Sequence, residues 1–164
     1  MYQRILVALG NEEAIDQKVL SEAIAIAVPS QGALNLIHVL LPPESGYPNP
    51  MYMTADGMHS AVNVDAFQMY IGQWQTEQQA NQKVLDTQVN QIQQEHGVAT
   101  EWTQAVGDPG RQICQVAKEW QADLIVMGRH SRSGISELWI GSVSNYVMHH
   151  AGCSVIVVQA PLLV

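Results

Sequence analysis

Short apolar runs alternate with helical patterns along this chain. The run at 5–9, Ile-Leu-Val-Ala-Leu, is continuous, which is typical of a parallel strand buried on both faces. Between such runs, apolar residues recur every three or four positions, as in helices that bury one face. The pattern predicts strands at 5–9, 33–41, 98–106, 124–127 and 154–158. It predicts a first helix that ends near residue 28 and three further helices at about 64–96, 109–120 and 142–150.

Residues with defined roles at helix ends mark several boundaries. Asn11 suits the N-cap of the first helix, and Pro29 is expected to stop that helix near residue 28. Gly97 suits the C-terminal cap of the long helix. Asp108 as N-cap and Pro109 at the first helical position together predict the start of the next helix.

The regular alternation of strand and helix predicts an α/β fold in a single domain, residues 1–164. An open parallel sheet with helices on both faces gives three layers. In such sheets, ligands bind beyond the carboxyl ends of the strands, where the strand order reverses. Spacing alone does not fix the order. With the order 3-2-1-4-5, the binding crevice lies between the first and fourth strands.

Residues 42–60 form a long segment without apolar periodicity. The segment holds four of the seven prolines. A loop of this length is either a mobile surface excursion or a functional element such as a lid. Both readings stay open.

The fourth strand is followed by a sequence suited to anion binding. The apolar run ends at Gly128 and a basic, Ser-rich loop that begins with Arg129. Gly141 and Ser142 then open a helix, whose first backbone N–H groups lack intrahelical partners and whose dipole is positive at that end. Ser142 suits the N-cap, and Gly141 lets a ligand approach the backbone. We therefore predict a phosphate site here.

Charge and composition narrow the class of partner. The formal net charge of −8 argues against nonspecific binding to nucleic acid or to anionic membranes. Two of the seven Lys and Arg residues lie at 129–132, which reverses the sign of the charge locally and favours an anionic ligand there.

The sequence also bears on compartment. No apolar run approaches the roughly 20 residues of a membrane span. The N-terminus passes straight into a strand without the pattern of a signal peptide. Cys114 and Cys153 lack a CxxC spacing and are expected to be buried, reduced thiols. These features predict a cytoplasmic protein.

Known catalytic and metal-binding patterns are not found. The chain has neither GxGxxG nor GxxxxGK[ST], and neither GxSxG nor HExxH. His38 lies in a predicted buried strand and is expected to be a hydrogen-bonded core residue. His149 and His150 fall at a helix end, where cations favour the dipole. We assign no catalytic residue and no metal ligand.

The loop and helix resemble those of the universal stress protein family. Members that bind nucleotide carry G-x2-G-x9-G-[ST] after the fourth strand, and Gly128, Ser131, Gly141 and Ser142 keep both spacings. The resemblance extends over the chain through ILVAL, LIHVL, GDPG, ADLIVMG and CSVIVV. It implies a Rossmann-like, adenine nucleotide alpha hydrolase-like fold of five strands in the order 3-2-1-4-5. It also implies a cytoplasmic location and a homodimer paired through the last strand.

The resemblance also implies a ligand, which is ATP or another adenine nucleotide such as AMP or ADP, with Mg²⁺ possible. It places Val39 against adenine, although simple core packing is an equal alternative for that residue. Ordinary turns and caps are the alternative roles for the glycines and for Ser142. Arg129 is our addition, on charge alone. The predicted nucleotide-binding residues are Ala8, Leu9, Val39, Gly128, Arg129, Ser131, Gly141, Ser142 and Ser144.

Two positions depart from the family pattern. Ser131 replaces the second glycine of the motif, so a positive backbone φ there would cost about 1 kcal/mol or more, whereas its hydroxyl could donate to phosphate. Gly10 occupies the place of an aspartate that contacts the nucleotide. The absence of the aspartate carboxylate removes a polar contact with the nucleotide, and it also removes a negative charge near phosphate.

Three functions follow from these expectations. The first is a nucleotide-binding regulatory homodimer whose ligand favours one of two conformations. The second is a nucleotide-free structural or interaction module, and the third is a slow ATPase. The dimer is expected to pair through the apolar edge strand formed by Val155, Ile156, Val157 and Val158.

Overall fold

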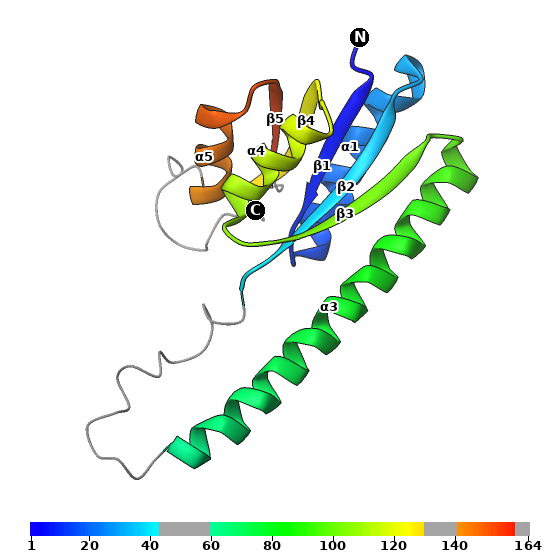
Figure 1. The fold of residues 1–164 in the computed structure, drawn as a ribbon. Coiled ribbons are helices and arrows are strands. Elements are labelled where there is room, and N and C mark those ends of the chain that lie inside the picture. Colours follow the sequence, from blue (N-terminus) through cyan, green and yellow to red (C-terminus); the bar gives the residue numbers. More distant parts are fainter. Residues whose placement is uncertain (43–59, 130–140, 160–164) are drawn as a thin grey trace, which may run out of the picture.

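Five strands form one parallel sheet in the order β3-β2-β1-β4-β5, which confirms the predicted fold class and strand order (Figure 1). The computed structural model describes residues 1–42, 60–129 and 141–159, without the side chains of 60–67. The strands are β1 Arg4–Leu9, β2 Ala33–Leu40, β3 Thr100–Val106, β4 Leu124–Arg129 and β5 Ser154–Gln159. The helices are α1 Glu13–Ser30, α3 Ser60–His96, α4 Pro109–Glu119 and α5 Ser142–His150.

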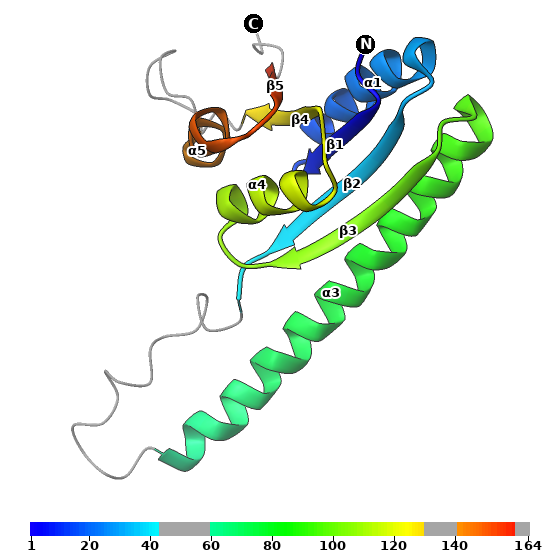
Figure 2. The ribbon, with the colours of Figure 1, turned by 45° about the horizontal axis from the view of Figure 1, so that its top comes forward.

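The sheet lies between two helical layers, each with its own apolar core. Helices α1 and α3 cover one face, and α4 and α5 cover the other (Figure 2). Because side chains alternate along a strand, Val7 packs toward α1 and α3 while Leu6 packs toward α4 and α5. Both residues are fully buried, as are Leu36 and Ile37 of β2. Burial on both faces explains why these strands are uninterrupted apolar runs.

The long helix α3 extends well beyond the sheet at its N-terminal end (Figure 1). It begins at Ser60, four residues earlier than predicted. Leu85 and Ile92 are buried in the core, whereas the neighbouring Val84 is 55% exposed. The helix also binds the sheet through polar groups: Gln82 Nε2 donates to Gln104 Oε1 of β3 at 3.0 Å. Gln82 therefore ties the middle of α3 to the edge of the sheet, although most of residues 75–82 are exposed.

Of the helix-end residues predicted for α1, α3 and α4, two are correct and two are wrong. Asp108 caps α4 by accepting from Arg111 N at 3.0 Å, and Gly97 follows α3 with a φ of +66°. The N-cap of α1, however, is Glu12 rather than Asn11, and it forms no side-chain cap bond. Pro29 lies inside α1, which continues to Ser30. A proline in the last turn removes only one N–H, so the helix can continue for a residue before Gln31 adopts the left-handed conformation.

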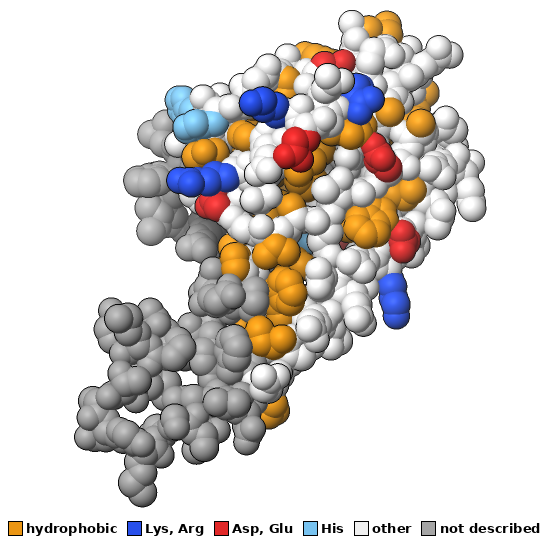
Figure 3. Space-filling view, viewed as in Figure 1, with side chains coloured by type: hydrophobic (Ala, Val, Ile, Leu, Met, Phe, Trp, Pro, Cys, Tyr) orange, Lys and Arg blue, Asp and Glu red, His pale blue; other side chains and the backbone are white. Residues whose placement is uncertain are grey.

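Charged side chains of both signs are intermixed on the face shown in Figure 3. Apolar side chains that remain exposed there and elsewhere include Leu41 at 58% and Met69 at 69%. Within the described ranges, none of the helices combines the length and apolar character that crossing a membrane would require.

Candidate functional site

The strand order places β1 and β4 side by side at the centre of the sheet, where the chain connections reverse direction. Ala8 of β1 pairs with Met127 of β4, while β2 lies on the other side of β1. The chain leaves β1 toward α1 on one face, and α5, which follows β4, lies on the other. We call the carboxyl ends of β1 and β4 the switch edge. This edge is where open α/β sheets bind ligands.

Ala8 and Val39 are brought to the same face of the sheet near this edge. Both contribute to the apolar cluster under α4 and α5, with Ala8 only 9% exposed and Val39 half-buried. Leu9 belongs to the opposite cluster, under α1 and α3. The structure therefore groups two of the three nucleotide-binding residues predicted on β1 and β2 and directs the side chain of the third, Leu9, into the other layer.

Gly128 lies within β4 and not in the loop where the sequence pattern placed it. It pairs with Val158 of β5. A Cβ atom on this residue would lie 2.3 Å from Ile15 Cγ2 of α1, which is far inside van der Waals contact. Close packing of α1 on the sheet thus requires a glycine here, independently of any ligand.

The N-terminus of α5 differs in detail from the prediction. Its N-cap is Gly141, with φ −55° and ψ 151°, and Ser142 is the first helical residue, so the predicted capping role of Ser142 is wrong. Gly141 O accepts from Asn145 N at 2.9 Å, but no side chain of the described residues caps the helix. The N–H groups of the first turn have no intrahelical acceptors, and residues 1–42, 60–129 and 141–159 supply no cap side chain for them, which is the arrangement that attracts anions.

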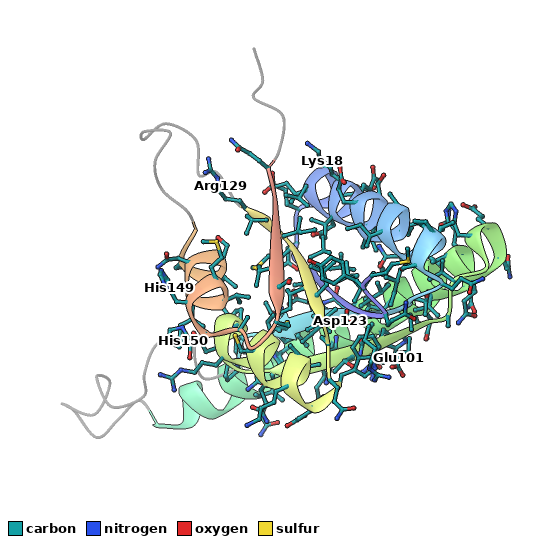
Figure 4. All side chains as sticks on the ribbon, turned by 90° about the horizontal axis from the view of Figure 1, so that it is seen from above. Lys18, Glu101, Asp123, Arg129, His149 and His150 are labelled. Carbon is teal, nitrogen blue, oxygen red and sulfur yellow. The ribbon has the colours of Figure 1, made fainter. Side chains whose placement is uncertain are left out.

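Two further predicted residues have contrasting environments. Ser144 is 2% exposed, and its Oγ donates to Gly141 O at 3.0 Å, so its proton is used inside the helix. Arg129 ends β4 and is directed away from the sheet (Figure 4). Its Nε is buried without a hydrogen-bond partner among the described residues. Ser131, together with residues 43–59, lies outside the described part of the chain.

A hydrogen-bonded turn after β1 was not foreseen from the sequence. Gly10 N donates to Asp16 Oδ1 at 2.8 Å, and His38 Nε2 lies 3.1 Å from Asn11 Oδ1. Asn11 is therefore bound to β2 instead of capping α1. Residue 10, where the family pattern has an aspartate, is a glycine in this chain. Its backbone N–H binds the carboxylate of Asp16, in the first turn of α1. The only sequence signal was a polar cluster after the first strand, which capping rules explained equally well.

His38 is a core residue, as predicted, with 6% of its surface exposed. Because Asn11 Oδ1 can only accept, His38 Nε2 carries the proton in the neutral ring. Nδ1 is then unprotonated, and it has no hydrogen-bond partner in the described residues. Burial lowers the pKa of His38, and the nearby carboxylates of Asp16 and Glu77 oppose that shift without cancelling it.

Other reactive groups lie away from the switch edge. Cys114 and Cys153 are half-buried free thiols, and burial raises the pKa of each. A groove of about 680 Å³ lies between α1 and α3, with Leu20 and Ile92 in its lining, on the face opposite α5. No group of three or more potential metal ligands occurs among residues 1–42, 60–129 and 141–159.

These features define an α/β domain of the Rossmann-like class, and comparison with known proteins identifies its family. The model of the universal stress protein family matches residues 1–159. Universal stress protein Sll1388 of Synechocystis is 38% identical over 158 residues, which cover 96% of this chain and 98% of that protein. The chain belongs to the universal stress protein family.

Solved structures share the fold. The universal stress protein of Archaeoglobus fulgidus in complex with dAMP superposes with a TM-score of 0.59 and 21% identity, covering 95% of this chain and 97% of that one. An Arabidopsis thaliana family protein with AMP bound gives a TM-score of 0.59 and 21% identity, over 98% and 93% of the two chains.

Gly128→Ala is expected to lower the free energy of unfolding by about 1–3 kcal/mol, because its methyl group overlaps Ile15. Gly72→Ala is the matched control, because a Cβ at this residue meets nothing within 4 Å. Replacing this glycine inside helix α3 should raise the free energy of unfolding by about 0.5–1 kcal/mol. Urea denaturation measures both. Equal stabilities for the two variants would contradict the packing role of Gly128.

The stability of the fold should fall as pH drops below about 6.5, the ordinary pKa of histidine. The pKa of His38 is lower in the folded chain, so the unfolded state takes up a proton first and is favoured by acid. His38→Gln can still donate to Asn11 but does not titrate, so its stability should depend less on pH. Parallel slopes for the two proteins between about pH 7.5 and 5 would refute this assignment.

Proposed function

We propose that this protein binds an adenine nucleotide at the switch edge and acts as a nucleotide-responsive regulatory protein in the cytoplasm. The base lies against Ala8 and Val39, and the phosphate lies at the N-terminus of α5 beside Gly141 and Ser142. The observation that carries the proposal is that this helix begins at the switch edge with a glycine cap, without a capping side chain from any residue that the structure describes. The nucleotides held by the Archaeoglobus and Arabidopsis proteins support the same ligand class.

The electrostatics of the site favour a phosphate despite the acidic protein. The formal net charge is −8, so a general attraction of anions is not expected. The end of a helix nevertheless carries about half a positive charge, and the Arg129 guanidinium adds a full one. The N-terminus of α5 and Arg129 therefore favour a compact anion such as a phosphate group. The apolar side chains of Ala8 and Val39 favour a ligand that also carries a base.

The remaining predicted residues have supporting roles in this proposal. Gly128 brings the backbone of β4 close to α1 and so positions the start of the phosphate loop. Leu9 contributes its backbone, since its side chain packs in the opposite layer. Ser144 orders the first turn through Gly141 O. Ser131, which lies outside the described part of the chain, stays a predicted phosphate contact. Mg²⁺, if it accompanies ATP, is held mainly by the phosphates.

A nucleotide-free interaction module is the second candidate. Two observations favour it: Gly128 has a packing role, and the Ser144 hydroxyl proton is already donated within the helix. Both residues would then match the motif for structural reasons alone. Slow ATP hydrolysis stays a prediction, and it would require a group that positions the attacking water.

Gly141→Val should weaken AMP binding about tenfold or more, equivalent to roughly 1.4 kcal/mol. The φ and ψ of Gly141 are accessible to any residue, so the change crowds the phosphate without straining the backbone. Calorimetric titration with AMP measures the effect, and adenosine, which has no phosphate, should bind both proteins alike.

Gly152→Val serves as a control at the opposite end of α5, where a Cβ meets nothing within 4 Å. It should bind AMP like the unmodified protein. If the unmodified protein binds neither AMP nor ATP at millimolar concentration, the nucleotide-free module replaces the leading proposal.

We also propose that two copies pair through the outer edge of β5. This strand is at the edge of the sheet, and Val155, Ile156 and Val157 are half-buried. An uncovered edge strand presents backbone N–H and C=O groups to a second strand, and a twofold copy satisfies both.

Val157→Lys is expected to convert the dimer to a monomer, because a charge beside the paired strands must be desolvated. Val157→Thr, which keeps the shape of the side chain, should remain dimeric. Light scattering after size-exclusion chromatography distinguishes the two states, and circular dichroism confirms that each variant is folded. A dimeric Val157→Lys protein would exclude this interface.

A further inference from the structure

The turn that follows β1 is held by two hydrogen bonds, and the partners that hold it, Asp16 and His38, also interact electrostatically with each other. Gly10 N donates to Asp16 Oδ1, and Asn11 Oδ1 accepts from His38 Nε2. The first bond joins the turn to α1, and the second joins it to β2. The turn lies directly after Leu9, which pairs with His38 across the two strands. It therefore forms one side of the switch edge, and its position depends on both bonds.

His38 is the titratable member of this arrangement. The residue is only 6% exposed, and Nδ1 has no partner in the described residues. The charged groups that act on the ring are Asp16 from α1 and Glu77 from α3. The paired positions on the neighbouring strands are uncharged, with Leu9 on β1 and Gln104 on β3.

We propose that His38 is a pH-responsive positioning residue that sets the nucleotide affinity of the switch edge by holding the turn at Gly10 and Asn11. This inference rests on the proposed nucleotide-binding function and adds its regulation. His38 contacts no nucleotide in this scheme. It acts through Asn11, whose place beside the ligand edge it fixes.

The two protonation states of His38 place different demands on the turn. The neutral ring donates once, from Nε2 to Asn11, and needs no further donor-acceptor pair to keep the turn in place. The protonated ring carries a second N–H and a positive charge in a buried position, which is costly without an acceptor. The carboxylates of Asp16 and Glu77 are the groups that can accept it.

Movement of the ring toward Asp16 disturbs both bonds of the turn together. It draws His38 away from Asn11 Oδ1, and it competes with Gly10 N for the Asp16 carboxylate. Acid therefore loosens the turn beside the base, while neutral pH keeps it in one position. A loosened turn lowers the affinity for nucleotide, because binding must then also order the turn.

The test is AMP binding by calorimetry at about pH 7.5 and about pH 5. The acid value lies well below the usual histidine pKa because burial lowers the pKa of His38. His38→Gln retains a donor for Asn11 without a titrating group. Relative to this variant at each pH, the unmodified protein should lose affinity about fivefold or more on acidification, the low end of typical coupling between sites. Taking the ratio cancels the titration of the AMP phosphate itself. His96→Gln, at the exposed end of α3, is the control and should behave like the unmodified protein.

Asn11→Ala keeps the test decisive if His38→Gln does not fold. Asn11 is exposed, so its removal should spare the core while releasing the turn from β2. This variant should bind AMP weakly at both pH values, as the unmodified protein does in acid. An equal loss of affinity in acid by His38→Gln, or full affinity of Asn11→Ala at neutral pH, overturns the regulation alone. Failure of the unmodified protein to bind AMP at either pH overturns the proposed function itself, and the regulation with it.

Discussion

The close contact between α1 and the central strands is the constraint on which the switch edge depends. Gly128 lies against Ile15 of α1 with no space for a Cβ atom, and Val19 and Ala23 of the same helix are fully buried. Because α1 lies this close to β4, its first turn also lies close to the end of β1. The carboxylate of Asp16, the residue after Ile15, accepts there from Gly10 N. The turn after β1 is consequently fixed by core packing at one end and by hydrogen bonds at the other.

The two layers of the domain contribute to the edge in different ways. The α4 and α5 layer provides apolar contacts from Ala8 and Val39 and the free amides at the start of α5. The α1 and α3 layer contains Asp16 and His38, the polar groups that hold the turn after β1. In the proposed function, a protein of net charge −8 attracts phosphate through the backbone dipole of α5 and the Arg129 guanidinium, while Asp16 and His38 hold the turn after β1 from the opposite face. This separation is the physical reason for considering binding and its regulation as properties of different layers.

Prediction from the sequence was most accurate where a single interaction determines the outcome. Strands buried on both faces need continuous apolar runs, so β1, β2 and β4 were recognised directly. Asp108 and Gly97 have local roles that their own neighbours satisfy, and both were correct. Asn11 failed because capping is only one use of its side chain, and a distant residue, His38, provides another. The end of β4 was placed too early because a glycine that ends an apolar run can equally continue a strand under a close helix.

The residue pattern and the family resemblance together determined the alternation of elements, the strand order, the place of the switch edge and the burial of His38. These properties depend on periodicity and on motifs that are continuous in the chain. Tertiary structure alone decided that Gly141 caps α5, that Ser144 bonds inside its own helix, and that Asp16 serves Gly10. Each of these outcomes depends on which of several polar partners comes within about 3 Å, and hydrogen bonding is too short-ranged for sequence spacing to choose among them.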